Sequence, residues 1–264
     1  MLTSKLMKQP RSKILKKGYI NVYSQLNSQE SRQFFYNCEY KKLNPKWDNS
    51  LILLCKKLGG KENLTVLDAG CGNGNYVIDE LRTKIAWACG VDLKAEFTQK
   101  NICLDEIKYA NLEKIPYPDN KFDLVLSLWV IEHLNNPAVV FNEIYRVLKP
   151  GGSFLLATPN RKCWLLLLKK FIGNKKINLL INSKLLGRNK IDIFPTYYKA
   201  NDINTLKKLL KHSGFTDINI ELNYDPGYTS FNYLSFYISN LFDKIFGYFL
   251  PSFYKQHIVG SARK

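Results

Sequence analysis

Short apolar runs alternate with helix-like repeats along the middle of this chain. Residues 64–67, 85–91 and 122–128 are continuous or nearly continuous apolar segments, as expected for strands buried on both faces of a sheet. A helical repeat of apolar residues follows Asn75, and another begins at Pro137, a residue that fits the first turn of a helix. Strands and helices that alternate in this way form a parallel sheet with crossover helices. The pattern therefore predicts an α/β fold.

The flanking segments divide the chain into a leader, a domain and two insertions. Asn44-Pro45 marks a boundary, so we expect a basic leader over residues 1–45 and one domain over residues 46–264. Two segments interrupt the alternating pattern of that domain, at 161–199 and 224–255. With 264 residues the chain is long enough to bury a full hydrophobic core.

The second insertion contains a strongly apolar helical segment, residues 231–250. At helical spacing its polar residues form only a narrow stripe, made of Ser235, Ser239, Asp243 and Gly247. Two interpretations remain open. The helix packs against the sheet or a homodimer partner, or it lies in the surface of an anionic membrane with help from nearby lysines.

The net charge of +17 is unevenly distributed along the chain. Six basic residues precede the first acidic one, Glu30, and the stretch 161–211 holds thirteen Lys and Arg against two Asp. A strong positive field attracts an anionic partner such as a nucleic acid, a membrane surface or an acidic substrate. The alternative explanation is a genome-wide bias toward lysine, with most of these side chains simply solvated.

Other bulk features exclude several classes of protein. The six cysteines form no C-x-x-C pair, so we expect reduced thiols in a cytoplasmic protein. The basic N-terminus lacks the apolar core of a secretory signal, and no uninterrupted run of about 18 apolar residues predicts a membrane-spanning helix. We therefore expect a cytoplasmic location, with peripheral attachment at the inner face of the membrane if the 231–250 helix is interfacial.

The most informative motif is VLDAGCGNG, residues 66–74, placed where a strand gives way to a helix. Glycines let the backbone turn sharply and let a ligand lie against it. No Lys-Ser/Thr pair follows, which excludes a P-loop, and Asp68 at the strand tip would repel a pyrophosphate but attract an ammonium group. A ligand with an adenosine end and a charged amino-acid end fits these features, and S-adenosylmethionine is such a ligand.

VLDAGCGNG also resembles the first motif of class I S-adenosylmethionine-dependent methyltransferases. The resemblance continues through Asp92 at the end of the next strand, NLEKIPYPDNKFDLVLSLWVIEHL from Asn111, and FNEIYRVLKPGGSFLLATPN over 141–160. These blocks are similar to the small-molecule, methyltransferase type 11-like branch of the family. The resemblance implies a Rossmann-like, doubly wound sheet of seven strands, mostly parallel with one antiparallel strand, with helical insertions. The strands at 216–222 and 257–263 would form its antiparallel hairpin.

The resemblance also assigns roles to residues around the motif. It implies that the methionine end of the cofactor binds at Asp68 and the turn, the ribose at Asp92 and Leu93, the adenine beside Asn111 and Leu112, and the cofactor floor at Ser127 and Leu128. The turn residues in this set are Gly70, Cys71, Gly72 and Gly74. The family often has Asp where this chain has Asn111, whose carbonyl can still accept a hydrogen bond from the adenine amine.

His133, just after the 122–128 strand, is the candidate general base, because imidazole titrates near working pH. Glu132 is adjacent and could orient it. The alternative is that His133 only caps the following segment and shapes the pocket. Similar quinone O-methyltransferases place an acid four residues earlier to bind a metal, but this chain has Trp129 there, so we expect no metal. His212 and His257 are interpreted as structural.

We expect a methyltransferase acting on a small or lipid- or glycan-linked acceptor, most simply at oxygen. Candidate substrate residues, assigned from their position in the first insertion, are Arg161, Trp164, Tyr197 and Tyr198. A nucleic-acid (RNA) methyltransferase is the alternative that the charge favours, but the strand tip SLWV lacks the Asn/Asp-Pro-Pro-aromatic sequence of base-amino enzymes, and no Pro-Cys nucleophile is present. The third hypothesis is a non-catalytic module that binds a membrane or a protein partner. The intact first motif argues against it, because that motif favours cofactor binding.

Overall fold

The computed structural model describes residues 28–264 except 59–60, 75, 100, 173–194 and 231. The chain divides into two compact units. The sheet unit comprises residues 50–162, 194–223 and 257–264, and the aromatic unit comprises 1–49, 163–193 and 224–256. The inserted parts of the aromatic unit thus lie close to the expected insertions. Most of the expected leader, residues 1–27, and part of the first insertion lie outside the described residues.

A single seven-stranded sheet forms the centre of the sheet unit, with strand order β3-β2-β1-β4-β5-β7-β6. Every pair up to β5 is parallel, whereas β7 runs antiparallel to both β5 and β6. The predicted Rossmann-like, doubly wound fold with its antiparallel hairpin is therefore confirmed. The strands are β1 (Leu64–Ala69), β2 (Ile85–Asp92), β3 (Glu106–Tyr109), β4 (Phe122–Leu128), β5 (Leu148–Pro159), β6 (Thr216–Asn223) and β7 (His257–Arg263).

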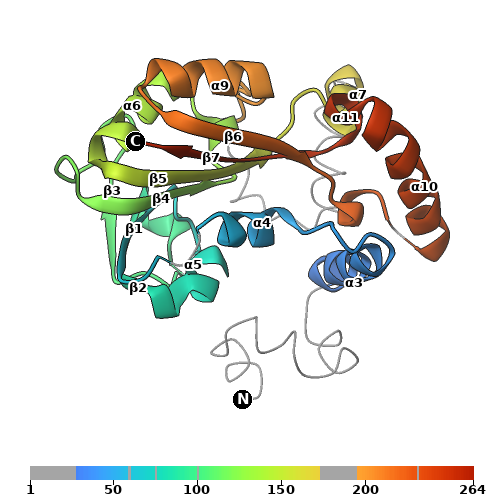
Figure 1. Ribbon diagram of the computed structural model, residues 1–264, viewed down its shortest axis with the longest axis horizontal. Helices are drawn as coiled ribbons and strands as arrows, with labels where there is room; N and C mark the ends of the chain where they lie inside the picture. The colour runs from blue at the N-terminus through green and yellow to red at the C-terminus, as the bar shows by residue number, and fades with distance from the viewer. Residues whose placement is uncertain (1–27, 59–60, 75, 100, 173–194, 231) are drawn as a thin grey trace. The chain divides into compact units, whose positions relative to one another are not determined.

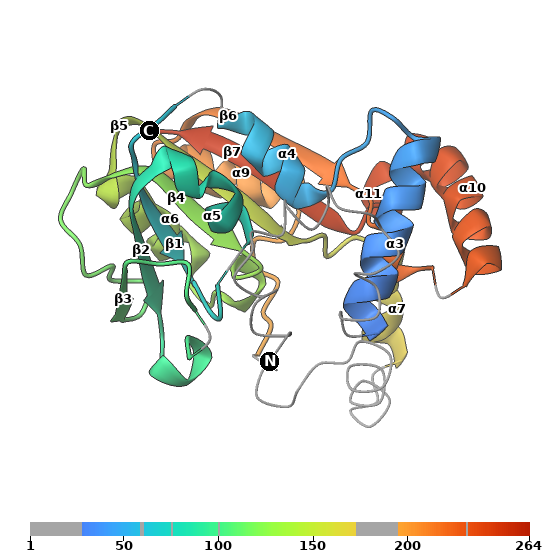
Figure 2. The same ribbon diagram turned by 90° about the horizontal axis from the view of Figure 1, so that it is seen from below.

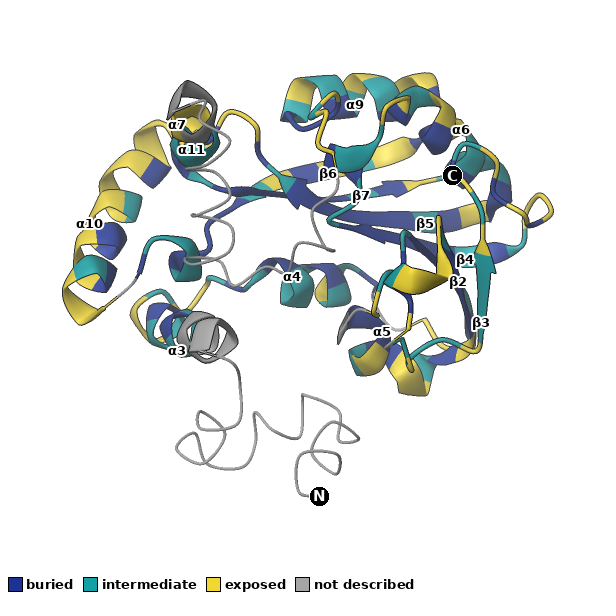
Figure 3. Cartoon of the chain, turned by 180° about the vertical axis from the view of Figure 1, so that it is seen from behind, coloured by how far each residue is buried: buried dark blue, intermediate teal, exposed yellow. Residues whose placement is uncertain are grey.

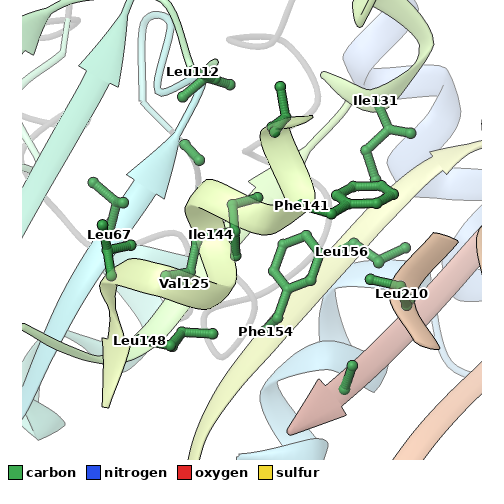
Figure 4. Packing of buried hydrophobic residues seen from close by; sticks show 14 of the residues in the cluster. Leu67, Leu112, Val125, Ile131, Phe141, Ile144, Leu148, Phe154, Leu156 and Leu210 are labelled. Atoms are coloured by element: carbon green, nitrogen blue, oxygen red, sulfur yellow. The ribbon is translucent and has the colours of Figure 1, made fainter. Parts of the chain in front are cut away.

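Helices cover both faces of this sheet (Figures 1 and 2). On one face lie α6 (Pro137–Val147) and α9 (Ile203–His212), and on the other α4 (Ser50–Lys57) and α5 (Tyr76–Leu81). Helix α6 begins at Pro137, as expected, and the side chain of Asp202 caps α9 by accepting from the Thr205 N–H. The buried side chains on the α6 face interlock around Phe141 and Phe154 (Figure 4). Short 3₁₀ turns complete the unit: η1 (Arg82–Lys84), η2 (Ala95–Phe97) and η3 (Ile131–His133).

Two elements begin beside irregular backbone. Helix α4 begins at Ser50 and follows a turn in which the Trp47 N–H bonds to the Asn44 carbonyl. Strand β5 begins at Leu148, and the bend at Gly151 (φ 73°) is absorbed as an irregularity in its pairing with β4.

The loop that follows β3 is held by a half-buried charge network. The Arg146 guanidinium donates to the carbonyls of Ile115 and Tyr117 and to Glu143, while Glu143 accepts from the Ile115 N–H. These hydrogen bonds hold the pKa of the Glu143 carboxyl below its usual value. The network fixes the loop after Leu112, which is itself buried in the core.

The aromatic unit is held together by ring packing. Its core consists of five buried aromatic side chains, Tyr36, Tyr40, Tyr224, Phe236 and Tyr254. Tyr36 stacks on Phe236 with ring centroids 5.2 Å apart, and Tyr224 stacks on Tyr254 at 5.4 Å. These rings come from α3 (Ser28–Leu43), α10 (Tyr233–Phe249), α11 (Pro251–Tyr254) and the strand end before η6 (Pro226–Tyr228); α7 (Trp164–Ile172) completes the unit.

Helix α10 has the reverse of the usual amphipathic arrangement. Its buried residues include the polar Ser239 and Asn240, while large apolar side chains along the helix are exposed (Figure 3). The polar stripe has partners inside the unit: Tyr254 donates to the Ser239 carbonyl, and the Tyr40 hydroxyl donates to Asp243. The exposed apolar residues are Tyr233, Leu234, Tyr237, Ile238, Leu241, Phe242, Ile245, Phe246, Tyr248 and Phe249. We call this set the α10 face.

Candidate functional site

The candidate site lies where β1, β2 and β4 end at the carboxyl edge of the sheet. The strand order runs outward from β1 through β2 in one direction and through β4 in the other. In open α/β sheets this reversal leaves a crevice beyond the strand ends, where ligands bind. The motif that follows β1, Asp92 at the end of β2 and the residues after β4 therefore share one edge.

The glycine turn after β1 depends on small residues at two positions. Gly70 has φ 84°, and a Cβ there would lie 2.4 Å from a methyl carbon of Val130. Gly72 has φ 43°, and its nearest such contact is 4.0 Å away. The first glycine is therefore required by close packing against the segment after β4, while the second leaves its backbone open to a ligand.

Asp92 faces this turn and is fixed by it. One carboxylate oxygen accepts from the Gly72 N–H at 2.8 Å, and the other accepts from the Leu93 N–H at 2.7 Å. Each carboxylate oxygen can accept more than one hydrogen bond, so the group can also receive two hydroxyls. Asp68, at the tip of β1, is 1% exposed. Asp68 and Asp92 thus stand near the ends of neighbouring strands, and their roles in binding a cofactor stay predictions.

Asn101 also fixes the glycine turn, and the sequence did not predict this role. Its amide donates to the carbonyls of Gly72 at 3.0 Å and Cys71 at 3.3 Å. It lies in a segment with no strand or helix pattern, so nothing in the sequence singled it out. Burial raises the pKa of the neighbouring Cys71 thiol, which makes it an inert packing group.

The remaining cofactor candidates are buried to different extents. Asn111 is exposed, and its side-chain oxygen accepts from the Glu113 N–H at 2.9 Å. Leu112 is buried in the core, and Ser127 and Leu128 are buried in the last two positions of β4. The strand end is linked to this loop because the Ala110 N–H donates to the Asp92 carbonyl at 2.9 Å.

His133 is oriented by a backbone carbonyl. Its Nδ1 lies 2.8 Å from the carbonyl oxygen of Pro195, and because a carbonyl can only accept, Nδ1 carries the proton. In the neutral ring Nε2 is then the unprotonated nitrogen, and the side chain is 29% exposed. Glu132 Oε1 lies 3.9 Å from Nε2, beyond hydrogen-bond distance. Pro195, 62 residues away in sequence, is therefore the orienting partner that sequence adjacency did not reveal.

Glu132 anchors the segment that carries Pro195. Its carboxylate accepts from the Thr158 hydroxyl at 2.9 Å, and its backbone carbonyl accepts from the N–H groups of Tyr197 and Tyr198. Asn201 donates to the same hydroxyl at 2.6 Å. The buried network thus joins the ends of β4 and β5 to the segment before α9, and it holds the wall around His133.

The candidate substrate residues do not all lie in one unit. Tyr197 and Tyr198 flank the His133 segment, and Tyr197 is 48% exposed. Arg161 pairs with Asp202 at 2.6 Å. Burial raises the pKa of that carboxyl, but hydrogen bonds from Thr205 and the nearby Arg161 outweigh it and leave the pKa lowered. Trp164 belongs to the aromatic unit instead, where it lines a cavity.

The remaining candidate groups are a metal site and the buried His257. No group of three or more His, Cys, Asp or Glu side chains there could hold a metal ion, and the expectation of no metal stays a prediction. His257 is buried, contacts Ser50 at 3.2 Å and packs edge-on against Trp129. Trp129 has φ 62° and bonds through its N–H to the Ala157 carbonyl. None of the helices in the described residues is long and apolar enough to cross a bilayer.

Known methyltransferases are similar to part of this chain. Residues 67–156 match the family model described as a methyltransferase domain. A probable S-adenosylmethionine-dependent methyltransferase of Mycolicibacterium smegmatis is 37% identical over 112 residues, 36% of this chain and 38% of that protein. A sterol 24-C-methyltransferase of Gibberella zeae is 28% identical over 153 residues, 53% of this chain and 40% of that protein.

Two further comparisons extend this result. A tRNA U34 carboxymethyltransferase of Nautilia profundicola is 36% identical over 104 residues, covering 37% of this chain and 35% of that protein. The chain therefore spans well under half the length of these three relatives, and the two whose names state an acceptor, a sterol and a tRNA, differ in it. A solved S-adenosylmethionine-dependent methyltransferase from Mesorhizobium loti superposes with a TM-score of 0.53 at 17% identity, over 81% of this chain and 96% of that one, which shows a shared fold.

Proposed function

We propose that this chain transfers a methyl group from S-adenosylmethionine to a hydroxyl oxygen of a lipid- or glycan-linked acceptor. The premise is that residues 67–156 belong to the class I S-adenosylmethionine-dependent methyltransferase family. The observation that carries the cofactor assignment is the geometry of Asp92. Its carboxylate is fixed by the N–H groups of Gly72 and Leu93, at the mouth of an open glycine turn. That arrangement suits a ribose, whose two adjacent hydroxyls both donate to one carboxylate.

The residues present fit the cofactor in charge as well as shape. Asp68 supplies a negative group near the turn, where the ammonium of the methionine end would lie, and Asn111 would border the adenine. When bound, the cofactor supplies a methyl group on a positively charged sulfur, already activated for displacement. The protein must then align the acceptor with that carbon and remove the acceptor's proton. His133 Nε2 would accept this proton, while Pro195 holds the ring through Nδ1.

A binding and product experiment tests this function. Calorimetry of the full chain with S-adenosylmethionine should show one site, and incubation with the methyl-labelled cofactor and cell fractions should place label in a solvent-extractable lipid fraction. Label recovered in RNA would change the proposed acceptor to RNA, while the assignment as a methyltransferase would stand. Failure to bind S-adenosylmethionine would overturn the function itself.

The aromatic unit supports a lipid-linked acceptor through its surface and its charge. The α10 face exposes large apolar side chains such as Leu234, Leu241 and Phe249, which are 70%, 58% and 72% exposed. The same unit carries 19 Lys and Arg against 6 Asp and Glu, so +13 of the total charge of +17 belongs to it. An anionic bilayer surface complements both properties, because apolar side chains enter the acyl boundary while basic residues bind lipid headgroups. We therefore propose peripheral attachment through the α10 face.

Vesicle flotation tests this attachment. We expect the chain to float with phosphatidylglycerol-containing vesicles, and the double variant Leu241→Glu/Phe249→Glu to lose at least about tenfold in binding, because burying each large apolar side chain is worth about 1.5 kcal/mol or more. Raising the salt concentration should also weaken the binding.

The matched control for flotation is Val139→Glu, a change at an exposed position of α6 that is 44% accessible and lies in the sheet unit. It should float like the unaltered chain. Equal flotation of the α10 double variant would contradict membrane attachment. A sedimentation shift from dimer to monomer in that variant would instead assign the α10 face to a second copy of the chain.

A further inference from the structure

The aromatic unit contains a cavity that the methyl-transfer site does not use. Its volume is about 560 Å³, within the range of roughly 300–1,000 Å³ typical of small-molecule sites. Residues from α7, η6, α10 and α11 form its walls, among them Trp164, Leu165, Tyr228, Ile238, Phe242 and Phe253. All of these residues belong to the aromatic unit.

The chemistry of the walls selects an apolar ligand. Aromatic and aliphatic side chains make up most of the lining, and the polar side chains in it are hydroxyls, Thr229, Ser235 and Ser239. All three hydroxyls already have partners: Ser239 contacts the Thr229 carbonyl, Ser235 the Asn232 carbonyl and Thr229 the Tyr224 hydroxyl. No Lys, Arg, Asp or Glu is among the lining residues. A charged or strongly hydrated ligand would lose its solvation there without compensation, whereas a hydrocarbon chain would not.

The cavity is continuous with the α10 face. Ile238, Phe242 and Phe246 line the cavity and are also 46%, 46% and 38% exposed. An apolar chain can therefore pass from that face into the cavity along apolar side chains. This continuity distinguishes the cavity from a sealed packing defect in the core.

We propose that this cavity binds one hydrocarbon chain of an amphiphilic lipid. The proposal rests on the membrane attachment proposed above, because the α10 face would meet the bilayer and the cavity would take the chain from it. The walls then select the ligand by its tail.

A displacement experiment with soluble amphiphiles tests the cavity. A fluorescent polyene fatty acid reports occupancy in the full chain, and neutral alkyl glucosides of increasing chain length compete with it. Affinity should rise about fourfold per added methylene, the equivalent of about 0.8 kcal/mol, and then level off when the cavity is full. Continued rise without a plateau would place the chains on the open α10 face and overturn the proposal.

Two tryptophan variants on the same helix provide the matched comparison. Ile238→Trp adds bulk at a cavity wall, and Leu241→Trp adds the same bulk at an exposed position that does not line the cavity. We expect Ile238→Trp to weaken fatty-acid binding at least tenfold and Leu241→Trp to leave it unchanged. Equal affinity in both variants would overturn the cavity assignment.

Two further measurements separate the possible failures. Binding of S-adenosylmethionine in the Ile238→Trp variant should equal that of the unaltered chain, which shows that the sheet unit is folded and that a lost tail site is independent of the cofactor site. Flotation with phosphatidylglycerol vesicles should also be retained in this variant. Loss of flotation together with fatty-acid binding would mean that both depend on the exposed α10 face rather than on the cavity, and would overturn the proposal.

Discussion

Asp92→Ala should weaken binding of S-adenosylmethionine by about 100-fold or more. Hydrogen bonds to a charged group are worth about 1.5–3 kcal/mol each, and the loss of two ribose contacts would cost about 3 kcal/mol, which exceeds a factor of 100. The variant also removes the acceptor for the Gly72 and Leu93 N–H groups, so the turn loses its anchor. Calorimetry of both proteins with the cofactor measures the difference directly.

Asp105→Asn is the matched control for this change. Asp105 also follows β2 in sequence, accepts from a backbone N–H, that of Ala88 at 2.8 Å, and pairs with Arg82. It lies outside the glycine turn, so its replacement should leave cofactor affinity within about twofold. If Asp92→Ala bound the cofactor as tightly as Asp105→Asn, the ribose assignment and with it the cofactor site would be wrong.

The parts of the fold that were predictable follow from local and repetitive signals. Apolar runs located β1, β2 and β4, because strands buried on both faces cannot include many polar residues. Pro137 located the start of α6, because proline lacks the N–H that an interior helical residue must donate. Asp92 was predictable for a similar reason, since it ends a recognisable strand at a fixed distance from a recognisable turn.

Long-range partners were not predictable in the same way. The carbonyl that orients His133 belongs to Pro195, and a backbone carbonyl carries no signature in the sequence. Asn101 donates to the Gly72 carbonyl from an irregular segment, where no sequence pattern distinguishes it from other Asn residues. Glu132 was expected to act beside His133, but its side chain is engaged by Thr158, which only the pairing of β4 with β5 brings near.

Helix α10 shows a different limit of sequence reasoning. The narrow polar stripe was correctly located, yet periodicity gives the width of a stripe and not the side on which it packs. In the structure the stripe faces inward, where the Ser239 hydroxyl donates to the Thr229 carbonyl and Asp243 accepts from the Tyr40 hydroxyl. The buried position raises the pKa of the Asp243 carboxyl. Polar partners from distant elements therefore decide the orientation, and the apolar side is left outward.

His133→Asn should lower kcat by about 100-fold to 10,000-fold, the usual contribution of a positioned general base, while leaving cofactor affinity unchanged. Asparagine keeps an N–H donor near the position of Nδ1, so the bond to the Pro195 carbonyl can persist, but it has nothing in place of Nε2. Initial rates of methyl incorporation into the acceptor, with calorimetry of cofactor binding on the same samples, measure both quantities.

His133→Gln completes this test, because glutamine reaches the position of Nε2 but does not reproduce the Nδ1 donor. If His133 only caps its segment through Pro195, the Asn variant should keep its rate and the Gln variant should lose it. If Nε2 takes the acceptor's proton, both variants lose the rate, because neither amide is a base. The order of the two rates thus separates a proton-accepting His133 from one that merely shapes the wall, even though both roles require the same ring in the same place.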